Sequence, residues 1–142
     1  MNLIGVVTVR PALVFAGLAL LAAGCQSERP GGTMQIEVAA APVSVLQTVN
    51  ERAHACWIRS GDRDFRGLAV IPELDTRTGN PRILIVERAK AQGLPRFVIE
   101  ASGSSPTRVV TYGPLAGQSL SSRINTDVTR WAAGDSSCKT RA

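Results

Sequence analysis

Four short segments with the composition of β-strands follow one another in this sequence, and the stretches between them are short. Those stretches carry turn residues, as in Thr78-Gly79-Asn80-Pro81. Parallel strands need a crossover connection of a dozen or more residues, usually a helix, and no stretch here has room for one. We therefore predict an antiparallel meander. Its four strands are expected at residues 65–71, 82–88, 96–101 and 107–112.

A fifth strand and a first helix precede this meander. Residues 34–38 alternate strictly between apolar and polar side chains, which is typical of a strand with one buried face. A helix is predicted to begin at Val45, with Ser44 as its N-cap, and to end at Gly61. Its buried stripe is expected to be Val45, Leu46, Val49, Ala53, Cys56 and Trp57.

A second helix follows the meander. Its apolar residues recur at helical spacing, at Leu120, Ile124, Val128 and Trp131, and Gly134 is expected to end it. Its outer side is expected to carry Ser121, Arg123, Asn125 and Arg130. The expected fold class is therefore α+β, with a single antiparallel sheet of about five strands and two helices on one face. The predicted element order is strand, helix, four strands, helix.

This order, over residues 34–131, resembles the helix-grip or TATA-binding-protein-like arrangement. The run Ile36-Glu37-Val38-Ala39-Ala40-Ala41-Pro42 before a helix is also similar to the opening of helix-grip proteins. The resemblance implies room for a small apolar ligand between the sheet and the C-terminal helix. Its walls would be Trp131, Phe97 and Ile99. The chain lacks the insertion after the first helix that larger ligand-holding members carry.

The N-terminal end has the parts of an export signal. Arg10 is followed by an apolar run at residues 12–21, then by Ala22, Ala23, Gly24 and Cys25. This pattern resembles the signal of bacterial lipoproteins. The resemblance implies cleavage before Cys25, acylation of its thiol, and a chain that faces the periplasm, with Gln26 favouring the outer membrane. The expected organisation is a signal peptide at 1–24, a flexible tether at 25–33 and one α+β domain at 34–142.

Two other interpretations of this segment stay open, an uncleaved membrane anchor and a soluble export signal with an incidental cysteine. The apolar run is too short to cross a hydrocarbon core of about 30 Å as a helix, which favours a cleaved signal. Removal of residues 1–24 takes away one charged residue, Arg10, and lowers the net charge from +5 to +4. Such a mild excess in an exported protein gives no reason to expect nucleic acid as a partner.

Two cysteines remain if Cys25 is acylated. An even number in an oxidising compartment predicts a disulfide between Cys56 and Cys138. The alternative is two separate thiols, one buried on a helix and one free in the tail. Two distant cysteines and the single histidine, His54, make no ligand cluster, so we expect no metal site.

Each of the four later strands has an arginine near its start, and alternation along a strand assigns each arginine to a face. The face under the helices is expected to hold Phe65, Ala69, Ile71, Ile83, Ile85, Phe97, Ile99 and Val109. The candidate interaction face is the opposite one, with Arg66, Arg82, Leu84, Val86, Arg96, Val98, Arg108, Val110 and Tyr112. An exposed apolar patch of this kind indicates a partner surface. Two alternatives remain open, arginine stems that cover the patch and bulges that change the register.

The sequence shows no combination of nucleophile, base, acid and metal ligands, so we expect neither an enzyme nor a cofactor. The expected function is a lipid-anchored, non-catalytic binding module of the cell envelope. It would be attached to the membrane by its acyl chains and would bind an envelope protein or lipid through the candidate face. The alternative is a carrier of a small apolar ligand.

Overall fold

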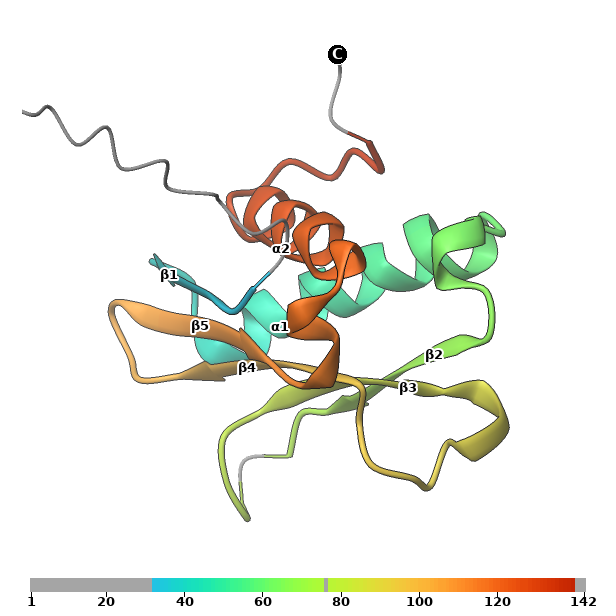
Figure 1. The fold of residues 1–142 in the computed structure, drawn as a ribbon. Coiled ribbons are helices and arrows are strands. Elements are labelled where there is room, and N and C mark those ends of the chain that lie inside the picture. Colours follow the sequence, from blue (N-terminus) through green and yellow to red (C-terminus); the bar gives the residue numbers. More distant parts are fainter. Residues whose placement is uncertain (1–31, 76, 140–142) are drawn as a thin grey trace, which may run out of the picture.

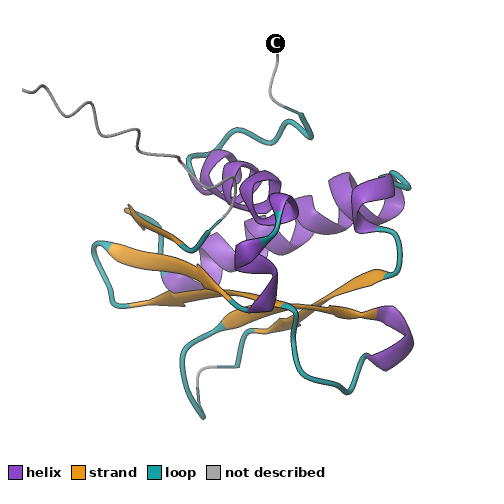
Figure 2. Cartoon of the chain, viewed as in Figure 1, coloured by secondary structure: helices purple, strands orange, loops and turns teal. Residues whose placement is uncertain are grey.

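The computed structural model describes residues 32–75 and 77–139. They form five strands, two α-helices and four short helical turns (Figures 1 and 2). The strands are β1 (Met34–Val38), β2 (Leu68–Glu73), β3 (Arg82–Glu87), β4 (Phe97–Ser102) and β5 (Thr107–Tyr112). The α-helices are α1 (Pro42–Ala53) and α2 (Ser119–Ala132). The short turns are η1 (His54–Arg59), η2 (Arg63–Phe65), η3 (Arg88–Lys90) and η4 (Pro114–Gly117).

The strands form one antiparallel sheet in the order β1-β5-β4-β3-β2. Strands β2 to β5 are the predicted meander, and β1 joins its far edge by pairing with β5. Both α-helices lie on the same side of the sheet, and no helix of the described residues covers the other side (Figure 1). The α+β fold expected from the element order is therefore confirmed.

The first helix begins earlier than predicted. Ala41 is the N-cap, Pro42 occupies the first helical turn, and Ser44 lies inside the helix, so the predicted cap at Ser44 is wrong. Proline suits this position because its fixed φ is helical and its missing N–H would have had no partner there. After Ala53 the chain continues through the π-helical turn η1 and leaves the helix before Gly61, whose φ is +70°.

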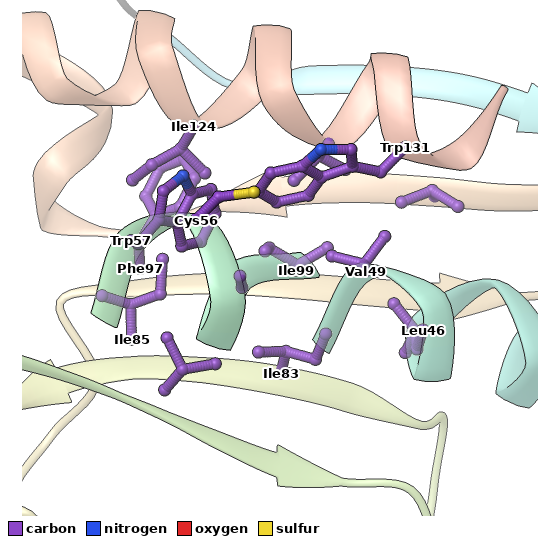
Figure 3. Close-up of a cluster of buried hydrophobic side chains, with 14 of the residues drawn as sticks. Leu46, Val49, Cys56, Trp57, Ile83, Ile85, Phe97, Ile99, Ile124 and Trp131 are labelled. Atoms are coloured by element: carbon purple, nitrogen blue, oxygen red, sulfur yellow. The ribbon is translucent and has the colours of Figure 1, made fainter. Parts of the chain in front are cut away.

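One hydrophobic core lies between the helices and the sheet (Figure 3). The predicted stripe of α1 and η1 is buried, as are Ile124, Val128 and Trp131 of α2. Trp57 is the centre of the aromatic packing. Its ring stacks on Phe65 with centroids 4.4 Å apart, and the Trp131 ring lies 5.0 Å away. Both tryptophans are core residues, as their helical spacing predicted.

Strand β2 differs from the prediction. Residues 63–65 form the turn η2, and the strand starts only at Leu68, after Gly67 with φ +81°. Val70 pairs with Ile85, and Ile71 pairs with Leu84. Cross-strand partners share a face, so Leu68 and Val70 point into the core while Ala69 and Ile71 point to the open side. The predicted faces of β2 are therefore reversed, because the turn at residues 66–67 shifts the alternation by one residue.

The outer side of α2 is also more buried than predicted. Ser121 has no exposed surface, and its hydroxyl donates to the carbonyl of Gln118 at 2.8 Å. The same hydroxyl accepts from the amide of Gly32 at 3.0 Å, and Asn125 donates to the carbonyl of Gly32 at 2.9 Å. The start of the described chain is thus hydrogen-bonded to α2, which is why Ser121 and Asn125 are not simply solvated.

Candidate interaction face

The strand register places most of the predicted face residues side by side. Leu84 lies opposite Val98, and Val98 lies opposite Tyr112. Val110 is opposite Glu100, which itself is opposite Arg82. We call this helix-free surface the open face. It comprises Ala69, Ile71, Glu73, Arg82, Leu84, Val86, Val98, Glu100, Arg108, Val110 and Tyr112.

Two of the predicted arginines differ from the expectation. Arg66 lies in the turn before β2 and not in a strand, so its predicted place on this face is wrong. Arg96 lies one residue before β4, and its guanidinium contacts the carboxylate of Glu87 at 2.5 Å. Arg108 is exposed on β5 and lies opposite Glu37 of β1. The arginines therefore stand at the borders of the open face.

The apolar centre of the open face is only partly accessible. Val86 and Val98 are 1% and 5% exposed, although neither belongs to the core under the helices. Leu84 and Val110 are half-buried. Tyr112 is 39% exposed and is the large apolar side chain that this face presents most openly. The accessible surface is therefore a mixed one, made of half-buried aliphatic side chains and the exposed tyrosine at the end of β5.

Ion pairs or hydrogen bonds within the chain hold most of the charged side chains around this centre. The guanidinium of Arg82 contacts Glu73 of the neighbouring strand at 2.6 Å, and this hydrogen bond raises the pKa of Arg82. The hydroxyl of Tyr112 donates to Glu100 at 2.8 Å. The amide of Asn80 donates to the same carboxylate at 2.9 Å. Partial burial, and secondly the bond to Glu100, raise the pKa of Tyr112.

The carboxylate partners were not part of the sequence prediction. Glu73 and Arg82 flank the β2–β3 hairpin, and their pairing across it follows from the register. Opposite charges on the two residues that flank a hairpin loop predict an ion pair, once the sequence has been assigned to a hairpin. Glu87 ends β3, and Arg96 comes after the loop of residues 88–95, so their contact depends on the path of that loop.

A hollow of about 520 Å³ adjoins this face at the β2–β3 hairpin. Its walls are largely polar and include Glu73, Arg82 and Glu100. Asp75, also in its wall, forms an ion pair with the guanidinium of Arg77, and this hydrogen bond lowers the pKa of Asp75. Each of these carboxylates thus has a side-chain partner already. Among residues 32–75 and 77–139, no group of three metal-ligating side chains occurs.

A buried carboxylate joins α2 to the turns at one end of the core. Asp127 is 1% exposed and accepts from the indole N–H of Trp57 at 2.8 Å and from Nε of Arg123 at 2.8 Å. Arg130 forms a further ion pair with it. Arg123 also contacts Asp62 at 3.1 Å. The network therefore connects α2 with η1 through Trp57 and with Asp62 through Arg123.

The predicted disulfide between Cys56 and Cys138 is present, with the two Cα atoms 5.0 Å apart. It ties the C-terminal tail to η1. The carbonyl of Ser137, next to the cysteine, accepts from the indole N–H of Trp131 at 2.9 Å. The tail therefore lies against the end of α2 as well as against η1.

The side chains expected to line a ligand space belong to this same core. Trp131 is buried against Trp57, and Phe97 and Ile99 have no exposed surface. The carrier function therefore stays a prediction.

Comparison with known protein families, characterised proteins and solved structures found no match for this chain. The likeness to the helix-grip arrangement therefore rests on element order and on the short run at residues 36–42. Within the described ranges no helix has the length and hydrophobicity needed to cross a bilayer. Cys25, the signal segment and most of the predicted tether lie outside the described residues.

Proposed function

We propose that this chain is a lipid-anchored, non-catalytic protein of the cell envelope that binds another envelope protein through its open face. The observation that carries the binding role is the helix-free side of the sheet, with an apolar centre and a border of paired charges. This is the anatomy of protein interfaces, which combine an apolar core with a polar rim. The anchoring role rests on the likeness of residues 20–25 to lipoprotein signals.

Tyr112 is the residue on which this interface would centre. It is the most exposed large apolar side chain of the open face, and tyrosine is among the residues that contribute most to binding energy at interfaces. The charged residues beside it are paired within the chain. The expected partner surface is therefore apolar at its centre and carries few unpaired charges.

Site-specific photocrosslinking in intact cells tests this proposal. A photoreactive amino acid replaces Tyr112 in one full-length chain and Gln47, an exposed residue of α1, in a matched control. The expected result is a discrete crosslinked product from position 112 and none from position 47. Equal products from both positions, or none from either, would overturn the binding role.

A charge-swap series then separates recognition from folding. Arg82→Glu with Arg96→Glu places like charges beside Glu73 and Glu87 and is expected to abolish the crosslinked product. A fourfold variant that also carries Glu73→Arg and Glu87→Arg restores both ion pairs with reversed polarity. If the partner recognises the original polarity, the product stays absent. If the product returns, the pairs serve the fold alone and the border has no part in recognition.

A further inference from the structure

Five exposed basic side chains lie at one corner of the domain, where η1, η2 and the start of β2 meet η3. Arg59 ends η1, Arg63 begins η2, and Arg66 follows it in the turn before β2. Arg88 and Lys90 belong to η3, at the end of β3. We call this set of five residues the basic corner.

Hydrogen bonds hold the two halves of the basic corner together. The backbone amide of Arg88 donates to the carbonyl of Gly67 at 2.8 Å, and its guanidinium donates to the carbonyl of Leu68 at 3.1 Å. Arg66 and Arg88 both line one surface hollow of about 150 Å³. The 63–67 turn and η3 are thus adjacent, at the end of the sheet where β2 begins and β3 ends (Figure 1).

The acidic residues nearby do not neutralise the basic corner. Asp62 and Asp64 both face Arg123, at 3.1 and 4.0 Å, and Glu87 pairs with Arg96. Within residues 32–75 and 77–139, none of the five cations has an ion-pair partner within 4.0 Å. This separates the basic corner from the borders of the open face, where each of Arg82 and Arg96 has its own glutamate.

The most exposed large apolar side chain of the described residues lies four residues after Lys90, in the loop that follows η3. Leu94 is 92% exposed and stands in the loop that joins η3 to β4. An aliphatic side chain that protrudes beside several unpaired cations is the combination that peripheral membrane surfaces bind, by insertion and by attraction to anionic headgroups.

The first described residue and the end of the loop that carries Leu94 both lie near η4. The amide of Gly32 donates to the hydroxyl of Ser121, whose oxygen also lies 3.2 Å from the carbonyl oxygen of Ala116 in η4. The neighbouring Leu115 donates its amide to the carbonyl of Arg96 at 3.0 Å, two residues after Leu94. The point where the predicted tether enters the domain and the Leu94 loop therefore both adjoin η4.

We infer that the basic corner and Leu94 dock the domain onto an anionic bilayer surface, the surface in which the acyl chains would be held. This inference rests on the proposed lipid anchor and adds an orientation to it. Each basic residue near an anionic surface contributes about fivefold to binding. Loss of two of them lowers the ratio of docked to undocked domain by about 25-fold.

Fluorescence quenching by brominated lipid in the reconstituted full-length chain tests this docking. Leu94→Trp places an indole at the proposed contact, and Gln47→Trp on α1 is the matched control. Trp57 and Trp131 are buried and give the same background in both. Quenching is expected for Leu94→Trp in vesicles rich in phosphatidylglycerol, and much less in neutral vesicles or at high salt. Equal quenching at both positions, or no dependence on anionic lipid, would overturn the docking.

Two charge-matched variants in the Leu94→Trp background assign the effect to the basic corner. Arg88→Glu with Lys90→Glu is expected to reduce quenching to the level of neutral vesicles. Arg52→Glu with Lys139→Glu makes the same change in net charge away from the corner and is expected to leave it unchanged. Equal losses in both variants would overturn the assignment, as would binding of an acidic protein to the corner without quenching by lipid.

Intact-mass analysis of the same preparation keeps the two proposals apart. Acylation at Cys25 without anionic-lipid-dependent quenching would overturn the docking and leave the anchor. Quenching without acylation would overturn the anchor and leave a corner that binds anionic lipid by itself.

Discussion

Gly113 is the residue at which the backbone has least freedom to accept a side chain. Its φ is +133°, and a Cβ atom there would lie 2.8 Å from the carbonyl oxygen of Arg96 and 3.0 Å from the Cα of Phe97. Both atoms belong to the backbone at the start of β4 and cannot move aside. This glycine allows β5 to turn into η4 against the neighbouring strand.

We therefore predict that Gly113→Ala lowers the free energy of unfolding by about 2–3 kcal/mol. Urea denaturation of the purified chain measures it. Gly117→Ala is the control, because a Cβ atom there meets nothing within 4 Å and φ is not in the left-handed range. Equal effects of the two substitutions would contradict the argument.

Asp127 is the second residue on which stability depends. Asp127→Asn keeps the shape but removes the charge that balances Arg123 and Arg130, so it is expected to cost about 2–3 kcal/mol of unfolding free energy. Asp64→Asn is the comparison, since Asp64 is largely exposed and 4.0 Å from Arg123, and about 0.5 kcal/mol is expected there. Thermal unfolding at neutral pH, followed by circular dichroism, distinguishes the two.

Tyr112 gives a titration that can be assigned without ambiguity, because it is the only tyrosine of the chain. Its pKa lies above the ordinary value of 10.0, through partial burial first and the hydrogen bond to Glu100 second. The ultraviolet absorbance of tyrosinate should therefore appear above pH 10 in the folded chain. Glu100→Gln is expected to move the midpoint only part of the way back, because burial remains.

The sign of the linked stability change follows from this shift. The folded chain holds the phenolic proton more tightly than the unfolded chain, so the free energy of unfolding falls as pH rises from 10 to the raised pKa. Tyr112→Phe should remove this contribution. A folded-state midpoint at or below 10, or the same pH dependence in Tyr112→Phe, would contradict the described environment.

At the scale of elements, the disulfide determines how firmly the C-terminal tail and η1 stay together. It joins positions 82 residues apart, and in the chain-entropy model a loop of that length contributes about 4 kcal/mol. Cys56→Ala with Cys138→Ala is expected to lower the free energy of unfolding by about that amount. Reductant should destabilise the wild type similarly and leave the double variant unchanged. A wild type that reductant does not affect would contradict this prediction.

The helices show why some elements were predictable and others were not. The stripes of α1 and α2 recur at 3.6 residues and identified the buried side chains, including both tryptophans. The start of α1 was missed because Pro42, and not Ser44, sets it. Ser121 and Asp127 are buried because their side chains form hydrogen bonds inside the molecule. Such polar residues do not follow the apolar pattern of a helix, so that pattern did not predict their burial.

The sheet shows how one local turn changes a predicted site. Phenylalanine is common in strands, but Phe65 lies in η2. The turn through Gly67 then makes the two faces of β2 the reverse of the predicted ones. Seven of the nine predicted face residues lie on the open face, because β3, β4 and β5 have no such irregularity. Their Glu partners depend on contacts between neighbouring strands and loops, and single-strand alternation contains no information on those contacts.

At the scale of the whole molecule, the proposed lipid anchor makes location depend on Cys25, which lies outside the described ranges. Cys25→Ser removes the thiol that the lipoprotein-like signal would present for acylation. We expect the wild type to incorporate labelled palmitate and to sediment with membranes, and the variant to incorporate none. Conservation of the Cys56–Cys138 disulfide in the variant is the control for export and folding. Labelling of the variant would show that acylation is elsewhere.

Under the proposed lipid anchor, the bonds between Gly32 and α2 would limit how far the domain can move from the membrane. Only seven peptide units separate Cys25 from Gly32, and a fully extended chain covers about 25 Å over that number. The segment would be two residues longer if the chain were not hydrogen-bonded to α2 before β1 begins. If Cys25 is acylated as proposed, a partner would have to come to the bilayer, because the domain could not leave it by more than roughly its own width.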